Sequence, residues 1–391
     1  MAASLTRMAR GIVESPRVLS VIEAMATPHA VDRYTELVDP MFTARDLRAE
    51  VTAVHRENDQ SVTLTLRPTR QWRGFAAGQF IQIGVVVDGV RHFRCFSPCN
   101  SEHRADGALE LTVKAGDDGL VSAYLYRQVR PGSVVDLEQA DGAFRLPAER
   151  PDDLVLISGG SGITPVLSML RTLVDEGHRG RVAFLHYVDR PENLVHADEL
   201  RRIAATQENV TVAVSYTGRG AGTAEAALPE SPPDGMLEAG VLEDGLKGRF
   251  ASEHLAVAAP WFADAETYLC GPAPMMDTVR ETYDRHGLGD VLHTEAFTVS
   301  RVIPDEDAAG TVTFSASGTS ADNSGETILE QAEGAGLSPE YGCRMGICFS
   351  CTAVRRSGCT RNVVSGEVDA DPDQSIQLCI NVPVGDVDVE V

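Results

Sequence analysis

Four cysteines near the carboxyl end of the sequence constrain its fold more than any other feature. Three of them lie within nine residues in the spacing C-x4-C-x2-C, namely Cys343, Cys348 and Cys351. A fourth, Cys379, follows 28 residues after Cys351. This spacing is typical of the thiolates that bind a [2Fe–2S] cluster, in which each of two iron atoms needs two thiolate ligands. The sequence therefore predicts a small iron–sulfur domain in this region.

Zinc, disulfide bonds and chance are the alternatives for this cysteine group. Structural zinc sites usually combine two C-x2-C pairs, and this region holds one. The segment from Met1 to Arg17 lacks the continuous apolar stretch of a secretory signal, so clustered cysteines favour metal or redox chemistry over disulfides. Gly346 allows the positive φ that a loop around a cluster requires. Cys359 does not fit the spacing, and we interpret it as a thiol outside the cluster.

Net charge and hydropathy exclude two classes of function. The chain carries 34 basic and 57 acidic side chains, a net charge of −23. Such a surface repels nucleic acids and anionic lipids, which argues against nucleic-acid binding. There is no run of about 18 apolar residues, so no membrane-spanning segment is expected. We expect a cytoplasmic protein that reaches the inner membrane surface only transiently, through a partner.

The pattern of apolar runs divides the chain into five segments. We expect an N-terminal helical arm at residues 1–44, a β-barrel domain at 45–150, an α/β domain at 151–298, a linker at 299–310 and the iron–sulfur domain at 311–391. The apolar stripe of the arm favours packing against the next domain, and docking to a partner or a membrane surface is the alternative.

Two different rhythms define the two larger domains. Six short strands and one helix near residues 120–129 predict a small antiparallel β-barrel. Strands that alternate with helices after residue 150 predict a parallel sheet covered on both faces. Residues 218–248 are rich in glycine, proline and glutamate, and this composition predicts a long acidic loop.

Three short motifs in the barrel domain suit a phosphate-bearing aromatic cofactor. One expected strand ends with Arg94, Cys95, Phe96 and Ser97, and another ends with Val113 and Lys114. The helix that follows opens with Gly119, Leu120, Val121 and Ser122. A helix start offers free N–H groups and the positive end of the helix dipole to a pyrophosphate. An arginine binds phosphate, and a phenylalanine face can stack on a ring.

The α/β domain carries a second phosphate-binding pattern. Its first strand leads into a glycine-rich turn and a helix through Gly159, Gly160, Gly162, Ile163, Thr164 and Pro165. This departs from G-x-G-x-x-G, yet a tight turn before a helix serves the same purpose. A later strand ends with Cys270, Gly271 and Pro272, and the last strand carries Glu295 and Phe297.

The choice between NADPH and NADH depends on the ends of the second and third parallel strands. A 2′-phosphate needs cationic or hydroxyl partners there, and the sequence offers Arg190, Ser215, Thr217 and Arg219. Asp189 favours NADH instead. We expect NADPH, with NADH as the alternative.

The order of these motifs resembles the ferredoxin–NADP reductase superfamily, followed by a plant-type ferredoxin domain of about 80 residues. The resemblance implies that Arg94 contacts phosphate, that Phe96 stacks on the flavin and that residues 119–122 hold the pyrophosphate. It places Cys270, Ser97 and Glu295 at the hydride-transfer site. The superfamily has tyrosine where this chain has Phe96, which leaves FMN open beside the expected FAD.

The ferredoxin resemblance implies an α+β domain of the β-grasp type. It assigns Cys343 and Cys348 to one iron atom, and Cys351 and Cys379 to the other. The expected route runs from NADPH through FAD to the cluster.

The N-terminal stretch at residues 27–40 looks like the arm of bacterial oxidoreductases that supply electrons to membrane acyl-CoA Δ9 desaturases. This resemblance implies a desaturase as the partner. The alternatives are a reductase for a cytochrome P450 or a ring-hydroxylating oxygenase, and, from another class, an iron–sulfur redox sensor.

Overall fold

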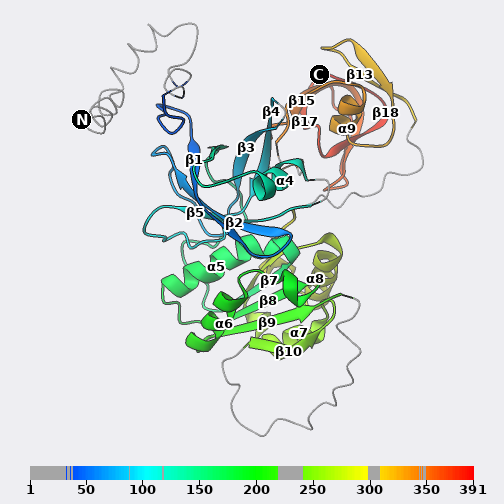
Figure 1. Cartoon of the computed structure of the whole chain (residues 1–391). Helices are drawn as coiled ribbons and strands as arrows, with labels where there is room; N and C mark the ends of the chain where they lie inside the picture. The colour runs from blue at the N-terminus through cyan, green and yellow to red at the C-terminus, as the bar shows by residue number, and fades with distance from the viewer. Residues whose placement is uncertain are drawn as a thin grey trace.

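The computed structural model describes residues 32, 36, 38–87, 89–116, 119–218, 241–297, 309–342, 344, 346 and 349–391. Most of the expected arm, the loop at 219–240 and the linker at 299–308 lie outside these residues. Three six-stranded sheets form the described part. Figure 1 shows the first sheet above the second, with the third beside β3 and β4.

The first sheet confirms the antiparallel strands expected in the first large domain. Its order is β4-β3-β6-β1-β2-β5, so it forms a half-barrel with β4 and β5 at its two ends. Alternate residues of the strands point inward and, together with Val121, Leu125 and Val129 from the region of α4, make a core of 16 buried side chains, most of them Val, Leu and Ile. The elements are β1 (Arg48–Arg56), β2 (Ser61–Pro68), β3 (Ile81–Val87), β4 (Val90–Phe96), β5 (Leu109–Lys114), α4 (Leu120–Arg127) and β6 (Val134–Leu137).

The described part of the arm is tied to this sheet by charge. The Asp32 carboxylate accepts backbone N–H bonds from Arg45 at 2.9 Å and Asp46 at 2.8 Å. Arg48 of β1 donates to Glu36 at 2.8 Å. These contacts fit the expectation that the arm packs against the first domain.

The second sheet is parallel throughout, as the alternating pattern predicts. Its order is β10-β9-β8-β7-β11-β12. Helices α5 and α6 pack on one face and α7 and α8 on the other, which gives two separate cores. The strands are β7 (Leu154–Gly159), β8 (Val182–Val188), β9 (Val210–Tyr216), β10 (Val241–Lys247), β11 (Glu266–Cys270) and β12 (Leu292–Glu295). The helices are α5 (Ile163–Asp175), α6 (Ala197–Thr206), α7 (Ser252–Ala258) and α8 (Ala273–Arg285), with short 3-10 turns η1 (Gly160–Gly162), η2 (Pro191–Asn193), η3 (Phe262–Asp264) and η4 (Gly289–Val291).

Strand β10 corrects the sequence prediction, because its residues fall inside the expected loop at 218–248. It pairs in parallel with β9 at the edge of the sheet, and the register shifts between Leu242 and Leu246. An edge strand needs a hydrogen-bonding neighbour on one side only, and the residues Glu243, Asp244 and Gly245 in its middle hide the strand pattern.

The third sheet has one parallel pair, β13 with β18, and is otherwise antiparallel, in the order β14-β13-β18-β15-β16 with β17 paired to β15. Helix α9 packs on it, so this domain is α+β as expected. A capping box of Thr327 and Glu330 starts the helix. The elements are β13 (Thr311–Phe314), β14 (Thr319–Asp322), α9 (Ile328–Gly334), β15 (Thr352–Asn362), β16 (Val368–Asp369), β17 (Gln374–Gln377) and β18 (Asn381–Val389).

No helix among the described residues is long and apolar enough to cross a membrane.

Candidate functional site: two nucleotide-binding motifs and a cysteine loop

Strand β4 brings the predicted flavin residues to one end of the half-barrel. Its last residue, Phe96, lies opposite Ile81 and packs half-buried against the core. Ser97 follows at 2% exposure, and its hydroxyl has no hydrogen-bond partner among the described residues. A buried hydroxyl without a partner is uncommon in folded proteins, so this position suits a polar atom of a bound cofactor. Cys95 stands opposite Gln82, half-buried.

Arg94, predicted to contact a cofactor phosphate, hydrogen-bonds to two backbone carbonyl groups in the structure. Its guanidinium donates to the carbonyl oxygen of Phe93 at 2.8 Å and to that of Gly342, in the third domain, at 3.0 Å. Its contact with a cofactor phosphate stays a prediction.

The predicted pyrophosphate turn lies between β5 and α4. Gly119 is the residue before the helix, and the Ser122 hydroxyl donates to its carbonyl oxygen at 3.1 Å. A Cβ atom at Gly119 would come within 2.1 Å of that hydroxyl, so a larger residue there would displace the Ser122 side chain from this bond. Leu120 is exposed, whereas Val121 and Val113 are buried in the barrel core. This glycine turn at a helix start fits the predicted phosphate cradle.

The two nucleotide motifs are 108 residues apart in sequence and in direct contact in the structure. A Cβ atom at Gly162 would lie 2.3 Å from the carbonyl oxygen of Cys270, and one at Gly159 would lie 2.8 Å from Pro272. Gly160 has φ +55°, which glycine adopts without strain. Only glycines permit the close approach at positions 159 and 162, whereas Gly160 has open space beside it, where a phosphate could come near the backbone.

The helix after the turn tolerates the proline that replaces the third glycine. Pro165 is the third residue of α5, where a backbone N–H has no partner within the helix and its loss costs little. Ile163 and Thr164 are buried beside it, and the Thr164 hydroxyl donates to the Ser161 carbonyl at 3.3 Å.

Strand register aligns the predicted catalytic residues of the α/β domain. Cys270 lies opposite Ser158 of β7 on one side and Glu295 of β12 on the other, at the carboxyl ends of all three strands. Ligands of parallel sheets bind at this edge. Phe297 packs half-buried against the neighbouring core.

Both reactive groups at this edge are held in their neutral forms. Burial raises the pKa of Glu295 to about 8. Burial and the nearby Glu295 carboxyl raise the pKa of the Cys270 thiol well above its usual value. One carboxyl oxygen of Glu295 has no hydrogen-bond partner among the described residues. A neutral carboxyl beside a neutral thiol suits an uncharged aromatic ring or amide.

Only some of the side chains expected to bind the 2′-phosphate are free to contact a ligand. Arg190 is exposed at the start of η2, and Asp189 accepts a hydrogen bond from Asn193 at 2.8 Å. Ser215 is fully buried and donates to the Gly248 carbonyl at 2.6 Å, so its hydroxyl is already used. Arg219 lies outside the described residues. Lys114, predicted with the flavin turn, lines a cavity together with Gly160, Thr164 and Asp189, and its contact with a cofactor stays a prediction.

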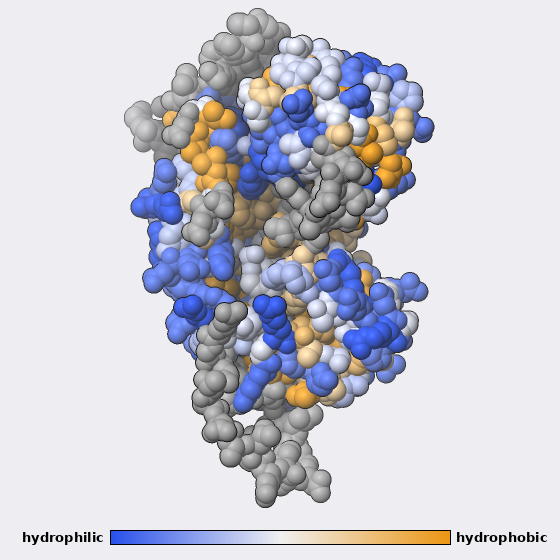
Figure 2. Space-filling view, turned by 90° about the vertical axis from the view of Figure 1, so that its right-hand side faces the viewer, coloured by the Kyte–Doolittle hydropathy of each residue, from blue (hydrophilic) through white to orange (hydrophobic). Residues whose placement is uncertain are grey.

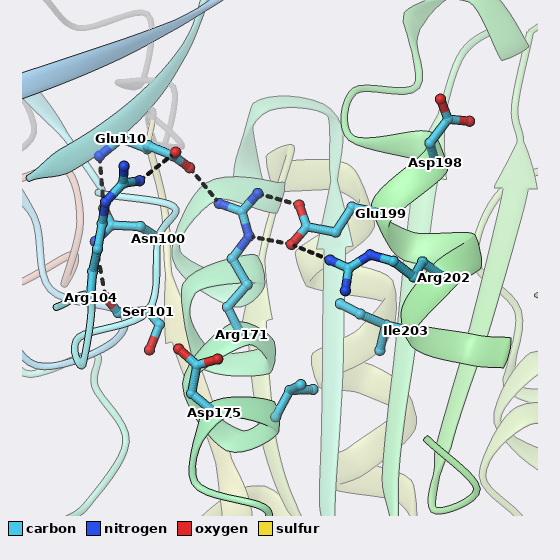
Figure 3. A pocket seen from close by; sticks show the side chains of 11 residues that line it. Asn100, Ser101, Arg104, Glu110, Arg171, Asp175, Asp198, Glu199, Arg202 and Ile203 are labelled. Carbon is cyan, nitrogen blue, oxygen red and sulfur yellow. Dashed lines mark hydrogen bonds and ion pairs between the residues drawn. The ribbon is translucent and has the colours of Figure 1, made fainter. Parts of the chain in front are cut away.

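Sequence reasoning missed a polar cluster at the junction of the first two domains. Arg171 of α5 contacts Glu110 of β5 at 3.1 Å and Glu199 of α6 at 3.0 Å (Figure 3). Figure 3 also shows Arg104 on the other side of Glu110, in the same pocket wall. Five of the charged side chains that line this pocket form a chain of ion pairs across the domain junction: Arg104, Glu110, Arg171, Glu199 and Arg202. Glu110, Arg171 and Glu199 come from three elements that are far apart in sequence, so no local motif predicts this cluster.

Behind Arg171 the same cluster holds a buried cysteine. The Cys99 thiol lies 3.4 Å from the Thr112 hydroxyl, which is 2.7 Å from Nε2 of His196. Burial alone would raise the pKa of Cys99, but His196 and Arg171 outweigh it and hold that pKa below its usual value. Cys99 and Thr112 of the first domain therefore share one polar cluster with Arg171 and His196 of the second domain.

Two of the four predicted cluster ligands are described. Cys351 is 2% exposed and Cys379 is 5% exposed, and both belong to the core of the third domain. The Leu378 N–H donates to the Cys351 carbonyl at 3.0 Å, which ties the two cysteine segments together. Cys343 and Cys348 lie outside the described residues.

The described parts of the cysteine loop have the backbone that tight wrapping requires. Arg344, Gly346 and Phe349 all have positive φ, between 57° and 77°. Gly346 packs so closely on Ile380 that a Cβ atom would lie 2.6 Å from it. Cys359 is instead in β15, opposite Val384. Thiolate donors on a strained, closely packed loop fit an iron–sulfur cluster, and that assignment stays a prediction.

Known proteins match this chain over both larger domains. The oxidoreductase FAD-binding domain matches residues 49–146, and the oxidoreductase NAD-binding domain matches residues 156–281. An NADPH oxidoreductase of Mycobacterium tuberculosis is 32% identical over 94% of this chain and 90% of that protein. A glycine betaine monooxygenase reductase subunit of Pseudomonas aeruginosa is 27% identical over 81% of this chain and 87% of that protein.

Solved structures share the fold. Phthalate dioxygenase reductase, described as modular for electron transfer from pyridine nucleotides to [2Fe–2S], aligns with a TM-score of 0.57 at 23% identity, over 89% of this chain and 98% of that one. The FAD/NAD-binding domain of a nitric oxide dioxygenase from Vibrio cholerae aligns with a TM-score of 0.52 at 25% identity, over 64% and 99%.

A half-barrel followed by a parallel sheet, with a glycine turn at its carboxyl edge, defines a flavin- and pyridine-nucleotide-dependent oxidoreductase. The chain belongs to the family of FAD- and NAD-binding oxidoreductases that includes the mycobacterial NADPH oxidoreductase.

Proposed function

We propose that this chain is a reductase that passes electrons from NADPH through FAD to a [2Fe–2S] cluster and on to a partner protein. The observation that carries the proposal is a contact: the flavin strand β4 touches the residue directly before Cys343, through the bond from Arg94 to Gly342. One chain thus places the predicted flavin residues against the predicted cluster loop.

The flavin domain would hold FAD with residues of two strands and one helix. Phe96 offers an aromatic face, and Ser97 offers a hydroxyl that no described residue hydrogen-bonds. The turn at residues 119–122 offers the positive end of a helix to the pyrophosphate. Arg94 supplies a cation at the same end of the sheet. Val113 and Val121 close the apolar side of the site, because both are buried in the barrel core.

The nucleotide domain would bind NADPH at the carboxyl edge of its sheet. Gly160 would let phosphate approach the backbone, Gly159 and Gly162 let the turn pack against the Cys-Gly-Pro motif, and Arg190 is an exposed cation available to a 2′-phosphate. Cys270 and Glu295 line the edge as neutral groups, which favours a flat ring and disfavours charged competitors. The bound cofactors supply the redox chemistry itself, because a flavin takes a hydride as a pair and can release electrons singly.

Four thiolates would bind the cluster: Cys343, Cys348, Cys351 and Cys379. The last two enter the core of the third domain from segments that are hydrogen-bonded to one another. Such a domain gives the chain a one-electron carrier beside its two-electron donor site.

The acceptor is proposed from two separate resemblances. The stretch at residues 27–40 favours a membrane acyl-CoA desaturase, which would bring this cytoplasmic chain transiently to the inner membrane surface. The names of relatives favour an oxygenase, since two of them are a glycine betaine monooxygenase reductase subunit and a ferredoxin reductase component of 3-ketosteroid-9-alpha-monooxygenase. Reconstitution with each acceptor, measured as product formed per NADPH oxidised, decides between them.

The visible spectrum of the pure chain, before and after anaerobic NADPH, tests the central proposal. We expect flavin and iron–sulfur absorption, and bleaching of both by NADPH. A chain without flavin, iron and sulfide after anaerobic reconstitution would overturn the proposal. A flavin and cluster that NADPH and NADH both leave oxidised would favour the redox sensor instead.

Loss of a cluster ligand separates the two halves of the route. In Cys348→Ser, we expect cytochrome c reduction to be lost while ferricyanide reduction persists, because the flavin can serve ferricyanide directly. Cys359→Ser is the matched control, since that thiol lies in β15 outside the predicted ligand set. If Cys348→Ser keeps both activities, the cluster is not on the route.

A further inference from the structure

The contact between the flavin strand and the third domain involves more than Arg94. Nδ1 of His92, also on β4, lies 3.2 Å from the Tyr341 hydroxyl, and the Arg94 guanidinium lies 5.4 Å from the centre of the Tyr341 ring. Figure 1 shows β4 facing the third domain. His92 and Tyr341 are 249 residues apart in sequence, so only the docking of the two domains brings them together.

The position of these residues on β4 links the contact to the flavin. His92, Arg94 and Phe96 are alternate residues of one strand and therefore share one face. Two of them reach the third domain, and the third is the predicted stacking partner of the flavin. The same face of one edge strand thus serves both sites.

On the other side, Tyr341 is tied to the cysteine loop. The Arg344 guanidinium lies 4.0 Å from the centre of the Tyr341 ring and also pairs with Glu333 of α9. The Tyr341 ring therefore contacts two guanidinium groups, one from each domain. Cation–π contacts of this kind are worth about 0.5–1 kcal/mol each at partly exposed sites. Movement of Tyr341 would therefore change its contacts with Arg94 in the first domain and with Arg344 in the third.

We propose that His92 and Tyr341 are positioning residues that hold the cysteine loop against the flavin strand and so set the rate of electron transfer between flavin and cluster. This inference rests on the proposed function. Oxidation of NADPH to NADP⁺ gives two electrons and a proton. One electron at a time reduces a ferric ion of the cluster to ferrous, the acceptor protein removes each in turn, and the proton passes to solvent. The rate of transfer between two bound groups falls steeply with their separation, so a looser contact slows that step alone.

Stopped-flow measurements on the full loaded chain test the proposal. In Tyr341→Phe and His92→Ala, we expect reduction of the flavin by NADPH to be unchanged and reduction of the cluster to slow by about fivefold, equivalent to about 1 kcal/mol. His92→Gln keeps a hydrogen-bonding group and should restore much of the rate. The double variant should be no slower than either single variant, because both remove the same contact.

A second readout needs neither cofactor. In the flavin- and iron-free chain, hydrogen–deuterium exchange of the backbone at residues 338–342 should be faster in Tyr341→Phe and His92→Ala than in the wild type. Tyr126→Phe is the matched control, because its hydroxyl donates to Asp59 at 2.7 Å within the flavin domain alone. It should change neither exchange at residues 338–342 nor cluster reduction.

Three results would overturn the inference: wild-type rates of cluster reduction in both single variants, additive effects in the double variant, or unchanged exchange at residues 338–342. If NADPH does not reduce the cluster of the wild type, the proposed function is overturned instead. The exchange measurement on the cofactor-free chain would still test whether His92 and Tyr341 hold the two domains together.

Discussion

At the scale of single residues, the carboxyl edge of the parallel sheet combines two unusual features. It contains a neutral carboxyl at Glu295, and two of its glycines, Gly159 and Gly162, have no space for a side chain. Both follow from burial, since a charged group in an apolar place costs far more than a neutral one. Each leads to a measurable expectation.

Glu295→Gln should change how stability depends on pH in the flavin-free chain. The pKa of Glu295 is raised from 4.5 to about 8 by burial, so the folded state binds the proton more tightly than the unfolded state between those values. The stability contributed by the protonated carboxyl is complete below about pH 4.5 and is lost as pH rises toward 8. The glutamine stays neutral throughout, so the variant lacks this loss.

We therefore expect the free energy of unfolding of the wild type, relative to Glu295→Gln, to fall by about 1–3 kcal/mol between pH 5 and pH 8. Urea unfolding at several pH values measures this difference. Glu281→Gln, on the exposed side of α8, is the control. Parallel pH profiles for the wild type and Glu295→Gln would contradict the assignment.

Gly162→Ala should damage both stability and nucleotide binding. The new Cβ atom would meet the Cys270 carbonyl oxygen at 2.3 Å, so the turn must move away from the Cys-Gly-Pro motif. We expect a loss of about 1–3 kcal/mol in the free energy of unfolding and weaker NADPH binding, measured by denaturation and titration. Gly334→Ala, with open space around it, should leave stability equal or up to about 1 kcal/mol higher. Equal behaviour of the two variants would argue against the close approach.

At the scale of elements, helix α5 both starts at the phosphate turn and joins the two larger domains. Arg171 lies two turns after the glycines and is 12% exposed, between Glu110 of β5 and Glu199 of α6. A helix fixed in this way holds the nucleotide turn in a constant position relative to the flavin sheet.

Arg171→Leu should destabilise the junction, because it leaves two half-buried carboxylates without their shared cation. We expect a loss of about 2–4 kcal/mol in the free energy of unfolding, measured by urea denaturation. Arg202→Leu is the matched control, since Arg202 is 67% exposed and lies 3.7 Å from Glu199. It should cost less than about 1 kcal/mol. Similar losses in the two variants would show that the junction does not depend on Arg171.

At the scale of the whole molecule, the net charge of −23 governs how the chain meets other proteins. Figure 2 shows hydrophilic residues over much of one face. In the third domain, three described cations are in ion pairs: Arg344 with Glu333, Arg355 with Asp369 and Arg356 with Asp373. A basic acceptor is therefore attracted over distances of about 10 Å at moderate salt.

The rate of cytochrome c reduction by the loaded chain should fall as ionic strength rises, because cytochrome c is basic and salt screens the attraction. Ferricyanide, a small anion, is the control: its reduction should rise with salt, since the same screening weakens repulsion. Steady-state rates across a salt series measure both. Equal salt dependence for the two acceptors would contradict electrostatic steering.

The sequence alone determined the local elements and their chemistry. Alternating apolar residues define the strands of the half-barrel, and a glycine turn between a buried strand and a helix indicates a phosphate site, because these are properties of neighbouring residues. The edge strand β10 was missed, since its pairing with β9 depends on a distant partner and its own residues carry little strand preference.

Only the tertiary structure decided which distant residues meet. The contact of Gly162 with Cys270, the neutral pair Cys270 and Glu295, the bridge through Arg171 and the pairing of His92 with Tyr341 all join positions from separate elements. Burial and close approach are consequences of packing between elements, and a linear pattern contains neither. The sequence therefore predicts the cofactor motifs and their order along the chain, but it does not predict which of them contact one another.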